Sequence, residues 1–228
     1  MTKVLVTGGA GFIGSNLVDK LIDEGFEVIV IDDLSAGKKE NLNPKAAFFE
    51  IDICDYDKML PVFETIEYVF HLAALPRVQY SVDYPKETHN ANVNGTLNVL
   101  LASKEKGVKK VIYSSSSSIY GDAKILPTKE DAVPDPMSPY ALHKLIGEQY
   151  CKLFSDLYNL KTISFRYFNV YGFRQSAEGA YATVIAKFIK QKNEGEPMTI
   201  FGDGEQTRDY TNVSDVAQAN ILAMRSDK

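Results

Sequence analysis

The stretch KVLVTGGAGFIGS, residues 3–15, decides the fold that the sequence predicts. Lys3–Thr7 predicts a short buried strand, and the glycines after it permit a tight turn. A helical pattern follows from Phe12 to Glu24, with apolar residues on one face. A strand, a glycine-rich turn and a helix in this order let a pyrophosphate approach the backbone at a helix N-terminus. The stretch therefore predicts a dinucleotide-binding unit.

Further strand patterns alternate with helical patterns along the first 168 residues. Strands are expected at 27–31, 47–51, 68–72, 109–113 and 162–166, with long helices at 87–106 and 139–158. This alternation predicts an α/β fold with a doubly wound parallel sheet of the Rossmann type. After Asn169 the pattern weakens to helices at 181–192 and 213–224 and a strand at 198–201. We expect a cofactor domain over 1–168 and a smaller, incomplete C-terminal substrate lobe over 169–228, whose 213–226 helix is free to pack back on the first domain.

Composition narrows the class of protein. The 228 residues carry a net charge of −5, so no overall attraction to nucleic acid or to an anionic membrane is expected. No apolar run approaches the length of a membrane span. Cys54 and Cys151 lie far apart without metal-ligand spacing, which favours reduced thiols, a cytoplasmic protein and no metal site.

Asp32 ends the second predicted strand, 18 residues beyond Gly14. An acid at this distance accepts hydrogen bonds from the ribose hydroxyls of a dinucleotide and repels a 2′-phosphate. No arginine lies nearby in the sequence. The pattern therefore favours NAD over NADP.

The pattern Y-x-x-x-K places a phenol and an ammonium on one face of a helix, where the cation favours the phenolate and makes a general base. The chain contains it twice, at Tyr120…Lys124 and at Tyr140…Lys144. Only Tyr140 starts a predicted helix, because Gly121 and Asp122 indicate a turn after Tyr120. Tyr140 and Lys144 are therefore the predicted pair. The serine run 114–118 follows a strand at the sheet edge where such folds bind ligands.

These motifs, taken in order, resemble the extended short-chain dehydrogenases/reductases, and within them the UDP-hexose 4-epimerase group of the NAD-dependent epimerase/dehydratase family. The resemblance runs from Lys3 to about Met224. Its motifs include TGGAGFIGS at 7–15, HLAA at 71–74, NVNGT at 92–96, SSSSSIYGD at 114–122, SPYALHK at 138–144, RYFNVYG at 166–172 and GDGEQTRDY at 202–210. Phe173 stands where the family often has proline.

The resemblance implies a role for each matching residue. The implied catalytic residues are Ser116, Tyr140, Lys144 and Asn92, whereas His71 is expected to be a buried strand residue. The implied NAD-binding residues are Gly8, Gly11, Phe12, Ile13, Gly14, Asp32, Asp33, Leu34, Ser35, Gly37, Asp52, Ile53, Leu72, Ala73, Ala74, Ser114, Tyr140, Lys144 and Tyr167. The implied substrate-binding residues are Ser116, Ser117, Ser118, Tyr140, Asn169 and Arg208.

The resemblance also narrows the reaction. Related dehydratases and decarboxylases carry Asp or Glu just after the catalytic hydroxyl residue, where this chain has Ser117 and Ser118. Neither serine can act as an acid or base near neutral pH, which favours a 4-epimerase of a UDP-sugar. Another nucleotide-sugar oxidoreductase or dehydratase, or a non-catalytic NAD-dependent sensor, remains an alternative. UDP-glucose, UDP-N-acetylglucosamine and UDP-glucuronate all remain open as substrates.

Assembly and completeness are also expectations from the resemblance. The family pairs the helices corresponding to 87–106 and 139–158 into a four-helix bundle, so a homodimer is expected. The substrate lobe lacks a segment that usually adds an arginine to the substrate diphosphate. We therefore expect normal NAD binding, and UDP-sugar binding at least about tenfold weaker than that of a chain with a complete lobe.

Overall fold

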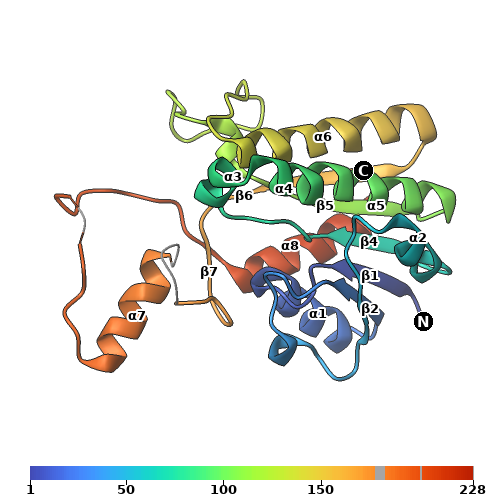
Figure 1. Ribbon diagram of the computed structural model, residues 1–228, viewed down its shortest axis with the longest axis horizontal. Coiled ribbons are helices and arrows are strands. Elements are labelled where there is room, and N and C mark those ends of the chain that lie inside the picture. The colour runs from blue at the N-terminus through green and yellow to red at the C-terminus, as the bar shows by residue number, and fades with distance from the viewer. Residues whose placement is uncertain (178–182, 201, 228) are drawn as a thin grey trace.

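A six-stranded parallel sheet forms the centre of the computed structural model, which describes residues 1–177, 183–200 and 202–227. The strand order is β3-β2-β1-β4-β5-β6, so the chain winds outward from β1 in two directions (Figure 1). The strands are β1 (Lys3–Thr7), β2 (Glu27–Asp32), β3 (Ala47–Glu50), β4 (Tyr68–His71), β5 (Lys110–Ser116) and β6 (Lys161–Tyr167). This order is the one found in Rossmann folds, and the predicted fold class is confirmed.

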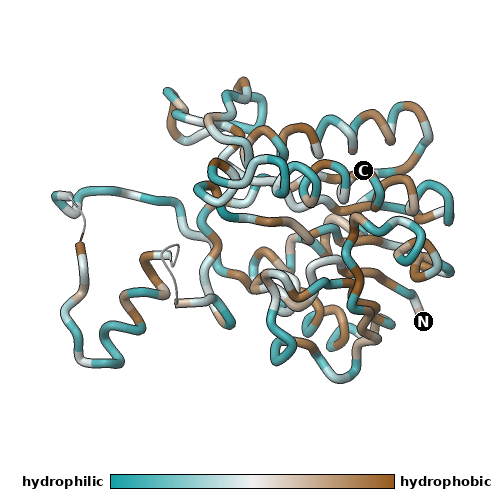
Figure 2. The backbone as a smooth tube through the Cα atoms, in the orientation of Figure 1, coloured by the Kyte–Doolittle hydropathy of each residue, from teal (hydrophilic) through white to brown (hydrophobic). Residues whose placement is uncertain are grey.

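Helices cover both faces of the sheet. On one face, α1 (Phe12–Asp23) and α8 (Val213–Arg225) bury Leu17, Leu21 and Ile221 against apolar residues of the strands. On the other face, α2 (Tyr56–Met59), α5 (Gly95–Glu105) and α6 (Pro139–Tyr158) supply a second core. Figure 2 shows hydrophobic residues gathered along the strands between these two layers. The strands are rich in β-branched residues and are covered by helices on both faces. This packing fixes the carboxyl edge of the sheet, where the candidate site lies.

The segment from Val78 to Glu105 contains the helix that the sequence predicts at 87–106, but a π-helical turn interrupts that helix. The segment consists of α3 (Val78–Asp83), α4 (Pro85–His89), a π-helical turn at Asn90–Asn94 and then α5. A π turn inserts an extra residue and reorients the side chains that it carries. Asn92 lies in this turn and is buried.

The chain between β6 and α8 forms a smaller unit. Val170–Tyr171 (β7) pairs in parallel with Thr211–Asn212 (β8), and α7 (Val184–Glu194) stands away from the central sheet (Figure 1). The strand predicted at 198–201 is wrong for residues 198–200, which form no strand, and Phe201 lies outside the described residues. Ile200 is 63% exposed, so its side chain is not packed as in a core strand.

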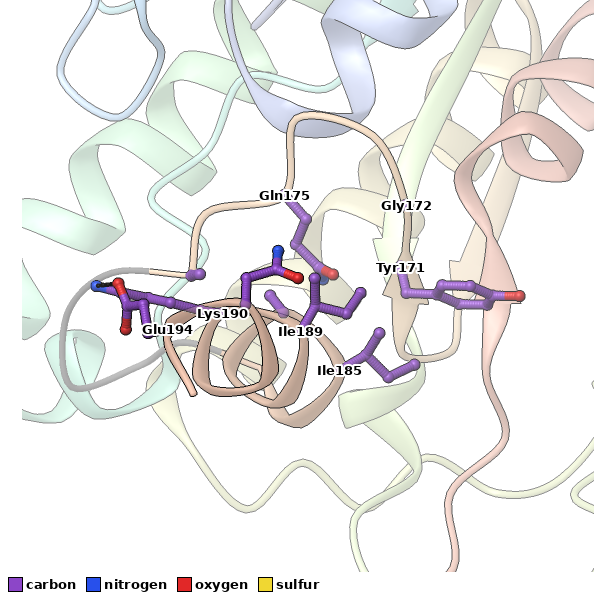
Figure 3. Close-up of a pocket in the computed structure, with 10 residues that line it drawn as sticks. Tyr171, Gly172, Gln175, Ile185, Ile189, Lys190 and Glu194 are labelled. Carbon is purple, nitrogen blue, oxygen red and sulfur yellow. Dashed lines mark ion pairs between the residues drawn. The ribbon is translucent and has the colours of Figure 1, made fainter. Parts of the chain in front are cut away.

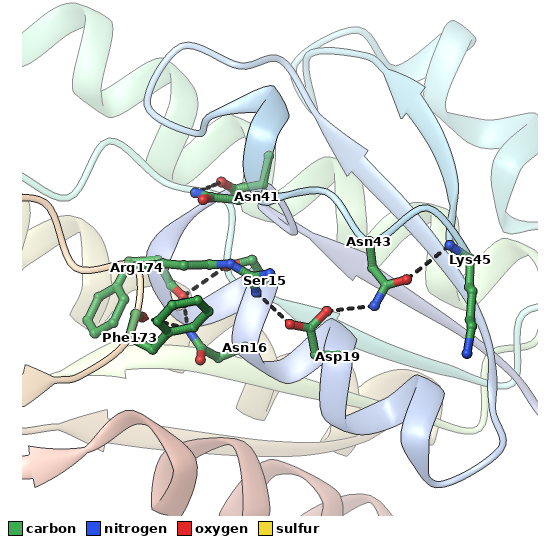
Figure 4. Close-up of polar contacts among 10 residues, drawn as sticks. Ser15, Asn16, Asp19, Asn41, Asn43, Lys45, Phe173 and Arg174 are labelled. Atoms are coloured by element: carbon green, nitrogen blue, oxygen red, sulfur yellow. Dashed lines mark hydrogen bonds and ion pairs between the residues drawn. The ribbon is translucent and has the colours of Figure 1, made fainter.

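Polar contacts join this smaller unit to the first helix of the cofactor domain (Figure 4). Arg174 pairs with Asp19 at 2.6 Å, and Asn16 donates a hydrogen bond from Nδ2 to the carbonyl of Phe173 at 2.9 Å. The loop that leaves β7 is therefore held against α1. No helix among the described residues has the length and apolar character required to cross a membrane.

Candidate active site

A cleft of about 460 Å³ lies at the carboxyl edge of the sheet, where the strand order reverses between β1 and β4. Every residue that the sequence predicts for cofactor binding lines this cleft, except Leu34. These residues come from the turn after β1, from the segments after β2, β3 and β4, and from β5, β6 and α6. The topology thus brings together residues that are up to 159 positions apart, from Gly8 to Tyr167.

The turn after β1 can accept a pyrophosphate. Gly8 has a φ of +74°, and a Cβ there would lie 2.7 Å from the amide nitrogen of Ala73. A Cβ on Gly14 would lie 2.1 Å from the Gly8 carbonyl oxygen. Gly11 is the N-cap of α1 and makes no side-chain cap, so no side chain occupies the first amides of that helix. These amides border the cleft and suit an anionic group.

Asp32 is 7% exposed and shapes the same turn. Its Oδ2 accepts a hydrogen bond from the Ala10 amide at 2.9 Å, and its Oδ1 accepts one from the Leu34 amide at 2.9 Å. Burial raises the pKa of the carboxyl, while these two backbone bonds act in the opposite direction. Each carboxylate oxygen can accept a further bond, so the side chain can hold a ribose hydroxyl while it supports the turn.

Two of the catalytic candidates, Tyr140 and Lys144, line the cleft, whereas Ser116 and Asn92 are not among its lining residues. Tyr140 stands in the first turn of α6, which Ser138 caps by accepting from the Ala141 amide. Lys144, one turn later, donates from Nζ to the carbonyl oxygen of Ser114 at 2.8 Å. That nitrogen lies 5.9 Å from the centre of the Tyr140 ring. A phenol and an ammonium therefore border the same part of the cleft.

Burial controls the titration of both groups. It raises the pKa of Tyr140, and a hydrogen bond with Ser116 opposes this shift. It also lowers the pKa of Lys144 to about 8. The sequence predicts that Lys144 lowers the pKa of Tyr140, whereas in the structure burial raises that pKa. The ammonium is turned to the Ser114 carbonyl and is itself desolvated, so the effect of burial on the phenol dominates.

The second Y-x-x-x-K match is engaged elsewhere. Tyr120 ends a short 3₁₀ helix (Ser117–Tyr120), and its hydroxyl accepts a hydrogen bond from Arg166 at 2.8 Å. Lys124 is exposed and pairs with Asp122. The two side chains of this match therefore belong to different local structures.

The serines at the end of β5 and in the 3₁₀ helix after it lie close together. The Ser118 hydroxyl donates to the Ser116 hydroxyl at 2.9 Å, and the Ser118 backbone amide donates to the same oxygen at 3.2 Å. Ser114 donates to the hydroxyl of Tyr167 at 3.3 Å. Ser117 lies in the 3₁₀ helix with Ser118.

Asn92, one of the implied catalytic residues, contacts the loop after β4. Its Oδ1 accepts from the Leu75 amide at 2.7 Å, and its Nδ2 donates to the Leu75 carbonyl at 3.1 Å. These two bonds fix the loop after β4. Sequence reasoning missed this loop: Leu75, Pro76 and Arg77 line the cleft, as do Ala36, Ile51, Cys54, Glu87, Asn90, Ala91 and Ser115. The position of the loop after a parallel strand is the signal that could have found it.

The predicted diphosphate ligands lie outside this cleft. Asn169 precedes β7 and donates to the carbonyl of Asp209 at 3.0 Å, and Arg208 precedes β8 and donates to the carbonyl of Thr207 at 2.7 Å. Both are exposed. A separate hollow of about 560 Å³ lies between β7 and α7 (Figure 3), with Ile185 and Ile189 on its helical wall.

Comparison with known proteins agrees with this arrangement. The sequence model of the NAD dependent epimerase/dehydratase family matches residues 4–228. A putative UDP-glucose 4-epimerase of Methanocaldococcus jannaschii is 44% identical over 97% of this chain and 73% of its own length. A UDP-N-acetyl-alpha-D-glucosaminuronate decarboxylase of Bacillus cytotoxicus is 38% identical over 97% and 71%.

Solved structures give the same result. The UDP-N-acetylglucosamine 4-epimerase from Methanobrevibacter ruminantium M1, in complex with UDP-N-acetylmuramic acid, superposes with a TM-score of 0.96 at 44% identity over 100% of this chain and 74% of that one. The UDP-glucose 4-epimerase of Thermotoga maritima with UDP-glucose has a TM-score of 0.95 at 48% identity over 98% and 74%. The chain therefore belongs to the NAD-dependent epimerase/dehydratase family.

Proposed function

We propose that this chain catalyses the 4-epimerisation of a UDP-sugar with NAD as a bound cofactor. The observation that carries the proposal is that Tyr140, which Ser116 contacts, and Lys144 line the same cleft as the glycine-rich turn and Asp32. Relatives of the same family named as UDP-sugar 4-epimerases support it at 44–48% identity.

The residues of the chain would divide the work along the cleft. The amides of the β1–α1 turn would hold the pyrophosphate of NAD, and Asp32 would hold the adenosine ribose. Ile53, Leu72 and Ala73 would supply apolar contacts to the cofactor. Bound NAD supplies the capacity to accept a hydride from the sugar carbon C4 and to return it.

Proton transfer falls to Tyr140. Its hydroxyl would take the proton of the sugar 4-hydroxyl while C4 is oxidised and would return a proton when C4 is reduced on the opposite face. Ser116 would hydrogen-bond the same sugar oxygen and keep Tyr140 oriented. Lys144, fixed by the Ser114 carbonyl, would stabilise negative charge on the phenol during the transfer.

The two serines after Ser116 support epimerisation over elimination or decarboxylation. Those reactions need a further acid or base beside the sugar, whereas Ser117 and Ser118 present hydroxyls that do not titrate near neutral pH. The carboxylates that line the cleft are Asp32, Asp33, Asp52 and Glu87. Asp32 ends β2, while Asp33 and Asp52 lie after β2 and β3. Glu87 accepts a hydrogen bond from Tyr80 at 2.6 Å.

We propose a division into a cofactor domain over 1–168 and a substrate lobe over 169–228. Asn169 and Arg208 would contact the substrate diphosphate, because the β7–β8 pairing brings their segments together. UDP-glucose, UDP-galactose and their N-acetyl forms are the substrates to test first.

We also propose a cytoplasmic homodimer. Leu153 and Leu157 of α6 are 49% and 67% exposed, and burial of such side chains against a second α5–α6 pair would form a four-helix bundle. Cys54 and Cys151 are both free thiols, which suits a reducing compartment.

The test is to incubate the chain with NAD and single UDP-sugars and to follow the sugar C4 configuration by proton NMR. We expect interconversion of at least one pair of C4 epimers, and loss of conversion in Tyr140→Phe with NAD binding retained. Formation of a 4-keto-6-deoxy sugar or of a decarboxylated sugar would support the dehydratase or decarboxylase alternative instead. NAD binding without conversion of any sugar would support the sensor alternative.

A further inference from the structure

One polar residue interrupts the apolar face that α8 turns to the sheet. Val213, Val216, Ala217, Ile221 and Met224 are buried on this face at helical spacing. Asn220 lies among them and is 0% exposed. A polar side chain in such a position costs stability unless its bonds are satisfied, so its presence calls for a physical reason.

The contacts of Asn220 fix the orientation of its amide. Nδ2 lies 2.8 Å from the carbonyl oxygen of Val216, which can only accept, so the nitrogen end must face it. The same nitrogen donates to the hydroxyl of Tyr167 at 2.7 Å. The Oδ1 atom is buried and has no hydrogen-bond partner among the described residues. The amide therefore acts only as a hydrogen-bond donor here, and one of its bonds reaches Tyr167.

Tyr167 connects this contact to the cofactor cleft. It is the last residue of β6, stands opposite Ser116 in the sheet register and lines the cleft. Its hydroxyl oxygen accepts from Ser114 at 3.3 Å as well as from Asn220. Its ring stacks on Phe165 with centroids 5.9 Å apart. Donors from β5 and α8 thus fix the phenol from two sides.

The end of α8 is itself anchored to the sheet. Lys110 of β5 is 2% exposed and donates from Nζ to the carbonyl oxygens of Ala223 at 2.9 Å and Ser226 at 2.6 Å. Arg225 pairs with Glu24 after α1 at 2.7 Å. A helix fixed at its C-terminus can hold the Asn220 amide in one place.

We propose that Asn220 is a positioning residue of the cofactor site, which orients Tyr167 and thereby couples α8 to NAD binding. The proposal rests on the placement of NAD in the cleft described above. It does not depend on which sugar is turned over, because its effect is exerted on the cofactor.

The test measures NAD affinity by calorimetry and the melting temperature of the chain without NAD. Asn220→Leu keeps a similar volume and removes both the donor and the unpartnered oxygen. We expect it to raise the Kd for NAD about five- to tenfold, the size of one lost positioning bond, without a lower melting temperature. Asn220→Asp, which removes the donor and keeps the shape, should weaken NAD binding in the same direction and serves if the leucine variant does not fold.

A double-mutant cycle and a matched control separate positioning from general packing. Tyr167→Phe should raise the Kd for NAD. The Asn220→Leu/Tyr167→Phe double variant should have a Kd no higher than that of the more weakly binding single variant, because both changes remove the same interaction. Ile221→Val, in the same buried face, should lower the melting temperature and leave the Kd unchanged.

The inference would be overturned by an unchanged Kd for NAD in Asn220→Leu. It would also be overturned if the fold-increases in Kd of the two single variants multiplied in the double variant. Normal NAD binding with no UDP-sugar turnover in the unmodified chain would instead overturn the proposed function and leave this inference intact.

Discussion

His71 should make the fold sensitive to acid through one buried proton. Its Nδ1 accepts a hydrogen bond at 2.7 Å from Thr7, and its Nε2 lies 2.9 Å from the hydroxyl of Thr96. Thr96 donates its own proton to the carbonyl of Asn92 at 2.7 Å, so it must accept from Nε2–H. The ring is therefore neutral, and a second proton on Nδ1 would require the Thr7 hydroxyl to change from donor to acceptor.

The size of the effect follows from the pKa. Burial, together with the charge of Lys144, lowers the pKa of His71 from 6.5 to about 3. A lowered pKa means that the unfolded chain takes up the proton first as pH falls. This contribution to stability is therefore complete above pH 6.5 and is lost toward pH 3. At about 1.4 kcal/mol per pH unit, the loss is about 2 kcal/mol at pH 5 and about 5 kcal/mol in total.

Urea unfolding followed by circular dichroism between pH 4.5 and 7.5 measures this loss. His71→Gln should be less stable at pH 7.5, but its free energy of unfolding should fall less steeply below pH 6.5 than that of the unmodified chain. His143, whose pKa is also lowered by burial, is present in both proteins and cancels in the difference of slopes. Equal slopes in the two proteins would refute the reasoning.

Three further predictions concern the cofactor, the base and the assembly. In calorimetry, Asp32→Ala should weaken NAD binding by about 1.5–3 kcal/mol and narrow the preference for NAD over NADP. If the unmodified chain bound NAD and NADP with equal affinity, the assignment of Asp32 to the ribose would be excluded. Tyr140→Phe should abolish turnover with NAD binding retained, whereas Tyr120→Phe should reduce turnover far less; equal losses would be inconsistent with the choice of Tyr140. A Leu153→Glu/Leu157→Glu variant should be monomeric at micromolar concentration by light scattering where the unmodified chain is dimeric, and a monomeric unmodified chain would contradict the proposed dimer.

The sequence is sufficient for the parts of the fold that repeat a local pattern. The alternation of short apolar strands with amphipathic helices predicts the parallel sheet, because each strand must be covered on both faces. The residues after the strand ends gather in the cleft for the same reason, since parallel strands bring their carboxyl ends to one edge.

The remainder depends on contacts that local patterns do not encode. The π turn at Asn90–Asn94 interrupts a run that reads as one helix, and it turns Asn92 to the loop at Leu75. The contact between Asn220 and Tyr167 joins residues 53 positions apart across the edge of the sheet. The pKa of Tyr140 depends on how deeply the phenol is buried, which the spacing to Lys144 cannot predict.

Transfer of the C4 hydrogen tests the central claim most directly. A UDP-sugar deuterated at C4 would be incubated with the chain and NAD, and the product epimer would be analysed by NMR and mass spectrometry. An epimerase that removes and returns the same hydrogen keeps the deuterium at C4 in the product, with no accumulation of NADH, and this is the result we predict. Exchange of the C4 deuterium with solvent, or net formation of NADH, would contradict the account.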